Sequence, residues 1–223
     1  MKRHLFLLIA CLLSCLQVMA QSDSLSNRLI PFVKGGLTVG LFSEDSYGSN
    51  SIGHTGYHIE AGVQIPFLSG SHGGWAFLIV PSAKYITKGD VLELLNEEKA
   101  TVDIHYIEIP VDFAARFRAK KISCLIGTGP YVSYGMKGRL TGSDRLYIFH
   151  GYRLKDEELD FFGPVVNASR WDAGINITGN VKLRHLFFSF DFDLGIVHVV
   201  PSRITRCDNS SIQAFSLGIG YAF

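Results

Sequence analysis

The end of the chain, residues 211–223, alternates between large apolar and small side chains. The odd positions carry Phe215, Leu217, Ile219, Tyr221 and Phe223, and the even positions carry Ala214, Ser216, Gly218, Gly220 and Ala222. A period of two predicts a β-strand, because successive side chains of a strand point to opposite faces. A strand of this length, with a continuous apolar face and an aromatic end, is typical of the wall of a transmembrane β-barrel.

The start of the chain has the pattern of a secretory signal peptide. Lys2 and Arg3 give it a positive start, an apolar run covers residues 5–13, and Ala20 supplies a small residue at the expected cleavage point. The run is too short to cross a bilayer as a helix, which takes about 20 residues. We therefore predict export with cleavage after Ala20. Lipidation at Cys15 is the alternative, since the residues before it resemble a lipoprotein box.

The composition excludes two broad classes of protein. Hydrophobic residues make up 47% of the chain and charged residues 18%, which excludes an intrinsically disordered chain. The formal net charge of +1 excludes a nucleic-acid-binding protein that relies on a basic excess, so we expect no nucleic acid as a partner. After the signal peptide no run of 18 apolar residues occurs. An exported, strand-rich chain of this kind is either a soluble periplasmic protein or a barrel.

Eight segments with a period of two follow the signal peptide. We predict strands at about residues 31–42, 54–67, 75–88, 101–117, 122–137, 169–183, 186–198 and 211–223. The connections alternate between short turns and long segments, and the long ones cover residues 43–53, 89–100, 138–168 and 199–210. An even number of strands, with long connections at one rim and tight turns at the other, is characteristic of outer-membrane barrels.

The predicted fold class is therefore all-β, an eight-stranded antiparallel up-and-down transmembrane β-barrel over residues 31–223. The signal peptide at 1–20 and a short periplasmic lead at 21–30 precede it. We expect an integral protein of the outer membrane with both termini in the periplasm. A soluble β-sandwich also gives alternating strands, but several of these strands exceed ten residues and keep aromatic side chains near both ends. The connection 138–168 is long enough for a functional loop or for an extension of its flanking strands.

The faces assigned to the lumen carry a set of charged side chains. They are Lys34, Glu60, Lys84, Glu108, Asp112, Arg116, Lys137, Asp172, Lys182, Asp191 and Asp193. Five are basic and six are acidic. The interior of an eight-stranded barrel is just wide enough for side chains, so these charges must pair with one another. We expect Asp191 and Asp193 to bind a Lys or Arg of a neighbouring strand, and Arg116 to pair with inward carboxylates such as Asp112.

No catalytic, cofactor-binding or metal-ligating residue is predicted, and we expect no enzyme activity. The chain lacks the Gly-x-Ser-x-Gly pattern of a serine nucleophile. His54 and His58 share a strand face but lie about 13 Å apart at the rise of a strand, too far to bind one metal ion. Cys124 and Cys207 fall at opposite ends of the predicted barrel, so we expect two unpaired thiols.

Several short motifs resemble the PorT-like outer-membrane β-barrel family of Gram-negative bacteria. They lie in order along the chain and cover 34–37, 56–58, 85–89, 106–110, 129–132 and 218–223. The resemblance implies an eight-stranded outer membrane protein β-barrel domain, and it implies no catalytic motif. One member of the family serves protein secretion to the cell surface.

From these features we expect a non-enzymatic protein whose barrel anchors surface loops for binding or for envelope structure. The alternative is an accessory component of a protein-secretion machine, and a membrane enzyme with a site at the rim is the third hypothesis. Expected partners are outer-membrane lipid and lipopolysaccharide, a possible secretion or envelope protein, and the barrel-insertion machinery, which would recognise Tyr221 and Phe223 of the last strand.

Overall fold

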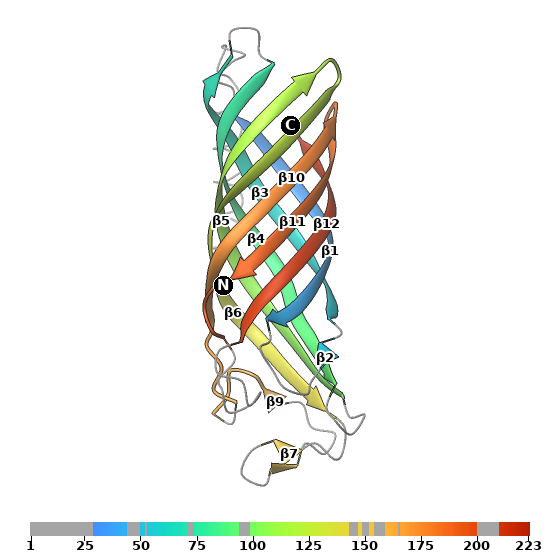
Figure 1. Cartoon of the computed structure of the whole chain (residues 1–223), viewed down its shortest axis with the longest axis vertical. Helices are drawn as coiled ribbons and strands as arrows, with labels where there is room; N and C mark the ends of the chain where they lie inside the picture. Colours follow the sequence, from blue (N-terminus) through green and yellow to red (C-terminus); the bar gives the residue numbers. More distant parts are fainter. Residues whose placement is uncertain are drawn as a thin grey trace, which may run out of the picture.

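Eight long strands wind around a common axis in the computed structural model of the chain (Figure 1). The structure describes residues 29–43, 50–51, 53–70, 74–93, 99–142, 147–148, 152–153, 159–164, 166–199 and 210–223. The predicted signal peptide and nearly all of the predicted lead, with Cys15 and the cleavage point, lie outside the described residues. No helix in the described residues is long and apolar enough to cross a membrane.

The strand bounds follow the predicted period-two segments closely. The eight wall strands are β1 (Ile30–Ser43), β3 (His54–Ser69), β4 (Trp75–Glu93), β5 (Lys99–Ala119), β6 (Ile122–Gly142), β10 (Trp171–Leu183), β11 (Leu186–Gly195) and β12 (Ser211–Ala222). Four two-residue strands accompany them, namely β2 (Asn50–Ser51), β7 (Tyr147–Ile148), β8 (Tyr152–Arg153) and β9 (Leu159–Asp160). The connection predicted at 89–100 begins later than expected, because residues 89–93 continue β4, and 94–98 lie outside the described residues.

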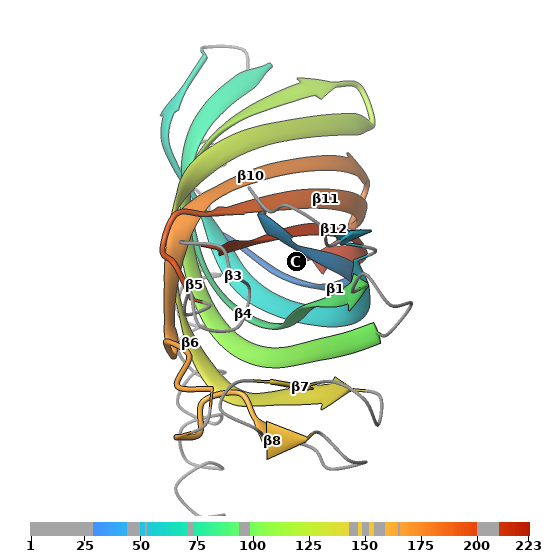
Figure 2. The same cartoon turned by 60° about the horizontal axis from the view of Figure 1, so that its bottom comes forward.

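Hydrogen bonding closes the sheet on itself. The wall strands pair in the order β10, β11, β12, β1, β3, β4, β5, β6, and β6 then pairs with β10. All of these pairings are antiparallel, including the one between the first and last strands, where Leu37 lies opposite Leu217. With the long-connection end brought forward, Figure 2 shows the strands arranged as a ring. The predicted eight-stranded barrel is confirmed, and its closure leaves no open sheet edge to face lipid.

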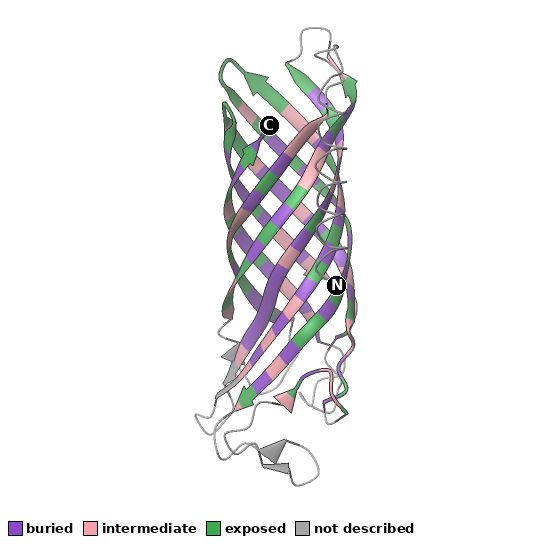
Figure 3. Cartoon of the chain, turned by 180° about the vertical axis from the view of Figure 1, so that it is seen from behind, coloured by how far each residue is buried: buried purple, intermediate pink, exposed green. Residues whose placement is uncertain are grey.

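Side chains alternate between the outside and the lumen along each strand, as the burial stripes in Figure 3 illustrate. In β12 the odd residues from Phe215 to Tyr221 are exposed, and Ala214, Ser216 and Ala222 are buried. The exposed apolar side chains of the other strands include Leu37 and Phe188, at 65% and 67% exposure. An outer wall of exposed apolar residues around a polar interior is the arrangement of a membrane-embedded barrel.

A β-bulge in one strand pair moves one predicted inward charge to the outside. The register between β5 and β6 shifts between His105 and Tyr106, so that Tyr106 lies opposite Gly135 while His105 lies opposite Lys137. An extra residue in β6 reverses which positions face inward beyond the bulge. Lys137 is consequently exposed, and its prediction as a lumen residue is wrong.

The end of the barrel with the long connections is filled by apolar side chains. The strands β4, β5 and β6 extend past their neighbours there, and β9 pairs with β6 through Leu159 and Leu140. The segment that follows β9 turns inward, and Phe161 is 0% exposed. We call this group the loop-end apolar cluster; its buried members are Phe42, Ile86, Val102, Ile104, Tyr106, Leu140, Phe161, Val166, Ala168, Val199, Ile212 and Ala214. Part of the connection 138–168 is therefore a strand extension, and another part folds over the lumen.

Candidate functional sites in the barrel lumen

Charges of alternating sign follow one line of strand register around the middle of the barrel. Lys34 lies opposite Glu60, Glu60 opposite Lys84, and Lys84 opposite Glu108. The line then continues through Ser133 to Asp172. Opposite charges that face one another on adjacent strands stabilise a sheet, whereas like charges destabilise it. The register therefore gives each of these lysines a carboxylate on an adjacent strand.

Two aspartates of β11 complete this network from another part of the wall. Lys34 Nζ donates to both carboxylate oxygens of Asp191 at 2.8 Å and lies 3.1 Å from Glu60. Thr178 also donates to Asp191, with an O–O distance of 2.6 Å. Lys84 Nζ donates to both oxygens of Asp193 at 3.0 Å.

A third lysine, Lys88, was not among the predicted inward charges, although it shares the strand parity of Lys84. Its Nζ lies 2.6 Å from Glu108, 3.3 Å from Asp193 and 3.7 Å from Asp172. The same ammonium lies 4.5 Å from the centre of the Tyr131 ring, within the range of a cation–π contact. Lys88 is 0% exposed, so these protein groups replace bulk water around its charge.

We call this network the salt-bridge ladder; it comprises Lys34, Glu60, Lys84, Lys88, Glu108, Asp172, Asp191 and Asp193, and all eight are buried. Asp191 and Asp193 do bind lysines, as predicted, but the prediction that these lysines lie on neighbouring strands is wrong. The neighbours of β11 are β10 and β12, whereas the lysines come from β1 and β4. The barrel is narrow enough for side chains to meet across the lumen, which strand adjacency alone does not reveal.

Carboxylates outnumber lysines in the buried part of the lumen. The salt-bridge ladder and the buried Asp112 together contain three lysines and six carboxylates, an excess of three acidic groups. Asp112 Oδ1 has no hydrogen-bond partner among the described residues. The predicted pairing of Arg116 with Asp112 is wrong, because Arg116 lies in a different part of the lumen, described next.

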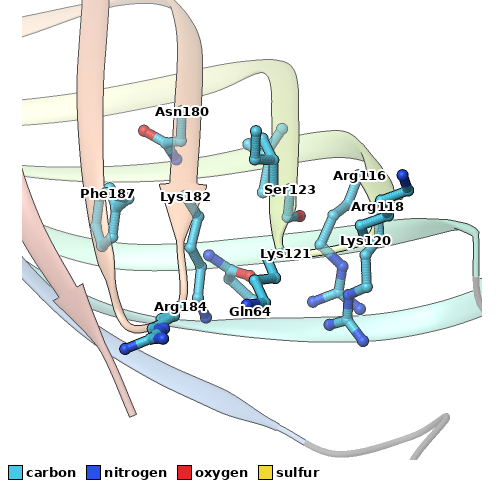
Figure 4. A pocket seen from close by; sticks show the side chains of 12 residues that line it. Gln64, Arg116, Arg118, Lys120, Lys121, Ser123, Asn180, Lys182, Arg184 and Phe187 are labelled. Atoms are coloured by element: carbon cyan, nitrogen blue, oxygen red, sulfur yellow. The ribbon is translucent and has the colours of Figure 1, made fainter.

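The end of the barrel with the tight turns holds a basic cavity of about 270 Å³ (Figure 4). Its basic lining residues come from β5, from the two tight turns and from β10, and we call them the basic vestibule: Arg116, Arg118, Lys120, Lys121, Lys182 and Arg184. No carboxylate lines this cavity in the described part of the chain. Arg116 and Lys182 are half-buried, and the buried Leu125 and Phe187 lie beside them.

The vestibule and the ladder are separated by apolar side chains. The buried residues Phe32, Leu78, Val80, Ala114, Leu125, Phe187 and Ala222 form one cluster. Phe32 and Phe187 contact edge to face, with ring centres 6.1 Å apart. Two of the predicted basic lumen residues, Arg116 and Lys182, do point inward, but they lie on the vestibule side of this cluster and not in the ladder.

The described residues contain no group of three or more His, Cys, Asp or Glu side chains arranged to hold a metal ion. His58 is buried, and its Nδ1 lies 3.2 Å from the Thr38 hydroxyl. His105 Nδ1 lies 2.8 Å from the Tyr85 hydroxyl, so it belongs to a hydrogen-bonded pair. Cys124 is a free, exposed thiol, whereas Cys207 lies outside the described residues.

Sequence comparison connects the chain to one family of known proteins. A family model described as an outer membrane protein beta-barrel domain matches residues 19–200. That match covers most of the chain and seven of the eight wall strands. No curated protein matches the sequence.

Solved structures with similar folds share little sequence with the chain. The attachment invasion locus protein Ail of Yersinia pestis is 14% identical over 87% of this chain and 99% of its own, with a TM-score of 0.41. Neisserial surface protein A is 8% identical over 86% of this chain and 97% of its own, with a TM-score of 0.44. OprG of Pseudomonas aeruginosa is 12% identical over 87% of this chain and 95% of its own, with a TM-score of 0.40.

Proposed function

The chain belongs to the family of outer membrane proteins with a β-barrel domain, and on that basis we propose that it is a non-enzymatic membrane anchor. In this proposal the closed barrel fixes the protein in the outer membrane. The long connections at one end then bind a partner or support envelope structure.

The observation that carries this proposal is the salt-bridge ladder. Three lysines and their carboxylates occupy the middle of the lumen, and Lys84, Lys88 and Glu108 are each at most 1% exposed. Eight strands leave an interior that side chains fill, so a continuous water path past the ladder is not expected. The loop-end apolar cluster adds a second obstruction at the long-connection end. Both features favour a rigid support over a channel.

The orientation is part of the same proposal. We place the long connections outside the cell and the tight turns, with both ends of the barrel domain, in the periplasm, as in bacterial outer-membrane barrels. Lipid and lipopolysaccharide would surround the apolar outer wall. Labelling of intact cells with an impermeant thiol reagent tests this. In a variant whose Cys124 and Cys207 are replaced by serine, a cysteine introduced at Asp160 should react, and one introduced at Lys120 should not; the reverse result would invert the orientation.

Conductance measurements test the anchor against a channel. Purified protein in planar lipid bilayers should give no steady ion conductance. A stable ohmic pore formed by the wild-type barrel would contradict the proposal.

A second candidate function rests on the motifs that resemble the PorT-like family, such as residues 106–110. Here the protein is an accessory component of a protein-secretion machine and acts through contacts with other envelope proteins. Co-purification from crosslinked membranes distinguishes the two. Recovery of secretion components would favour the second function, and recovery of envelope-structure proteins or none would favour the first.

A further inference from the structure

The basic vestibule concentrates positive charge that the rest of the described protein does not neutralise. Six cationic side chains surround one cavity of about 270 Å³, and no carboxylate lines it in the described ranges. Arg116 and Arg118 lie close enough to Lys182 to repel its ammonium group. Like charges held together without a counter-charge disfavour the folded state, so the arrangement calls for an anion.

The strand register fixes where such an anion would lie. Arg118 and Lys182 both lie opposite Ser123, one on each side of β6. Adjacent strands are about 4.8 Å apart, so the two backbones are separated by about 10 Å with a small hydroxyl residue between them. A compact anion above Ser123 is within reach of both flexible cationic side chains. Figure 4 shows basic side chains entering the cavity from these two sides.

The backbone of the two turns adds an independent observation. Lys120 and Arg184 adopt positive φ angles of 53° and 60°, in the left-handed region. Residues with a β-carbon are disfavoured there, whereas Gly or Asn fits without strain. Both positions nevertheless carry a basic residue, and both residues line the same cavity. A backbone conformation that costs free energy is typically retained at sites where the residue has a function.

We propose that the basic vestibule is a binding site for a phosphate group, carried either by a soluble phosphoryl compound or by an anionic phospholipid headgroup. Arg guanidinium groups donate paired hydrogen bonds that match phosphate oxygens, and Lys adds a point charge. The volume is near the lower end for small-molecule sites, which suits a compact anion. The cavity also reaches the rim of the barrel, because Ile122 lines it and is 50% exposed.

The site does not depend on the anchor function or on the orientation of the barrel. The vestibule lies at the tight-turn end in either case, and each leaflet of a membrane offers lipid phosphates. If this proposal fails, the closed barrel and the expected absence of ion conductance are therefore unaffected.

Calorimetric titration with inorganic pyrophosphate tests the site on the full barrel in detergent. Wild-type protein should bind it saturably at constant ionic strength. The double variant R118Q/K182Q should bind about a hundredfold more weakly, since each of the two lost charge-assisted hydrogen bonds is worth about one factor of ten. The matched control is Lys137→Gln, which removes one exposed positive charge outside the vestibule and should bind like the wild type.

A turn variant separates loss of binding from loss of folding. Arg184→Gly removes a vestibule cation and also relieves the positive φ at that position. It should raise the melting temperature of the free protein while it weakens pyrophosphate binding several-fold. A damaged fold would instead lower both quantities, so a folded variant with reduced binding supports the site.

Native mass spectrometry of protein released from mixed phosphatidylglycerol and phosphatidylcholine nanodiscs identifies the source of the phosphate. Retention of phosphatidylglycerol by the wild type, reduced in R118Q/K182Q, would assign the site to a lipid headgroup. Pyrophosphate binding without such retention would assign it to a soluble compound. The proposal is overturned if the wild type binds neither probe, or if Lys137→Gln weakens binding as much as the double variant does.

Discussion

Lys84 and Lys182 are both inward-facing lysines of long wall strands, and their surroundings are opposite. Lys84 is 1% exposed and contacts Glu108 and Asp193 in the salt-bridge ladder. Lys182 is half-buried in the basic vestibule, where its charged neighbours are Arg116 and Arg118. The two regions lie in one lumen, with an apolar cluster between them. The position of a charge along the barrel axis therefore decides whether it has a partner.

This comparison shows why a total of inward charges is a poor guide to pairing. Five basic against six acidic residues suggest a balanced lumen. In the structure the ladder region has an excess of carboxylates, and the charged residues that line the vestibule cavity in the described part of the chain are all basic. Buried charges without partners are costly, whereas charges at an open mouth are solvated by water. Removing a single partner from the ladder is consequently costly, whereas the vestibule is free to bind an external anion.

The largest expected effect is the removal of two ladder lysines together. The variant K84M/K88M leaves Glu108, Asp193 and Asp172 without their lysines in the middle of the barrel. Breaking one buried pair costs about 3–5 kcal/mol, so the double loss should prevent assembly. The heat-modifiable band of the folded barrel in gel electrophoresis should disappear. A double variant that folds at wild-type yield would remove the distinction between the two regions.

A change in the vestibule should act in the opposite direction. Arg184→Gly relieves a left-handed backbone conformation and removes one of the mutually repelling cations. We expect the free energy of unfolding to rise by about 1 kcal/mol. Urea unfolding followed by the fluorescence of Trp75 and Trp171 measures it. A clear loss of stability would mean that Arg184 has a structural partner.

The smallest expected effect concerns the excess of carboxylates. Asp112 is buried, and its Oδ1 has no hydrogen-bond partner in the described residues. Asp112→Asn keeps the shape and removes one surplus acidic group, so the free energy of unfolding should change by less than about 1 kcal/mol. A much larger loss in the same urea titration would indicate that the Asp112 carboxylate neutralises one of the ladder lysines.

The sequence predicted the wall of the barrel well because membrane strands follow a simple period. All eight strands could be predicted from the sequence, and the alternation was clear in segments such as β12 but blurred at residues 76–81 of β4. The side on which Lys137 lies could not be predicted, since the bulge near His105 has no clear sequence signal. Residues 89–93 were likewise not predicted to belong to a strand, because they begin a charged segment whose sequence is typical of a loop.

Only part of the candidate sites could be predicted from the sequence. The alternating line from Lys34 to Glu108 follows from strand register, and its regular spacing along the chain was a usable signal. The contacts of Asp191 and Asp193 cross the lumen, so they depend on the stagger of the closed barrel. A residue belongs to the vestibule if it points inward and lies beyond the apolar cluster along the barrel axis. The stagger of the strands also sets the height of each residue along this axis. A count of charges per strand therefore predicts neither the contacts of Asp191 and Asp193 nor the position of the vestibule.

The lumen divides into a paired ladder and an unpaired basic vestibule, and one matched measurement tests this division. Lys84→Met and Lys182→Met make the same chemical change on the same inward face of two wall strands. In urea titrations the free energy of unfolding of Lys84→Met should fall by about 3–5 kcal/mol, because Glu108 and Asp193 lose a buried partner. Lys182→Met should lose nothing beyond about 0.5 kcal/mol, or become more stable. Equal losses in the two variants would contradict the division.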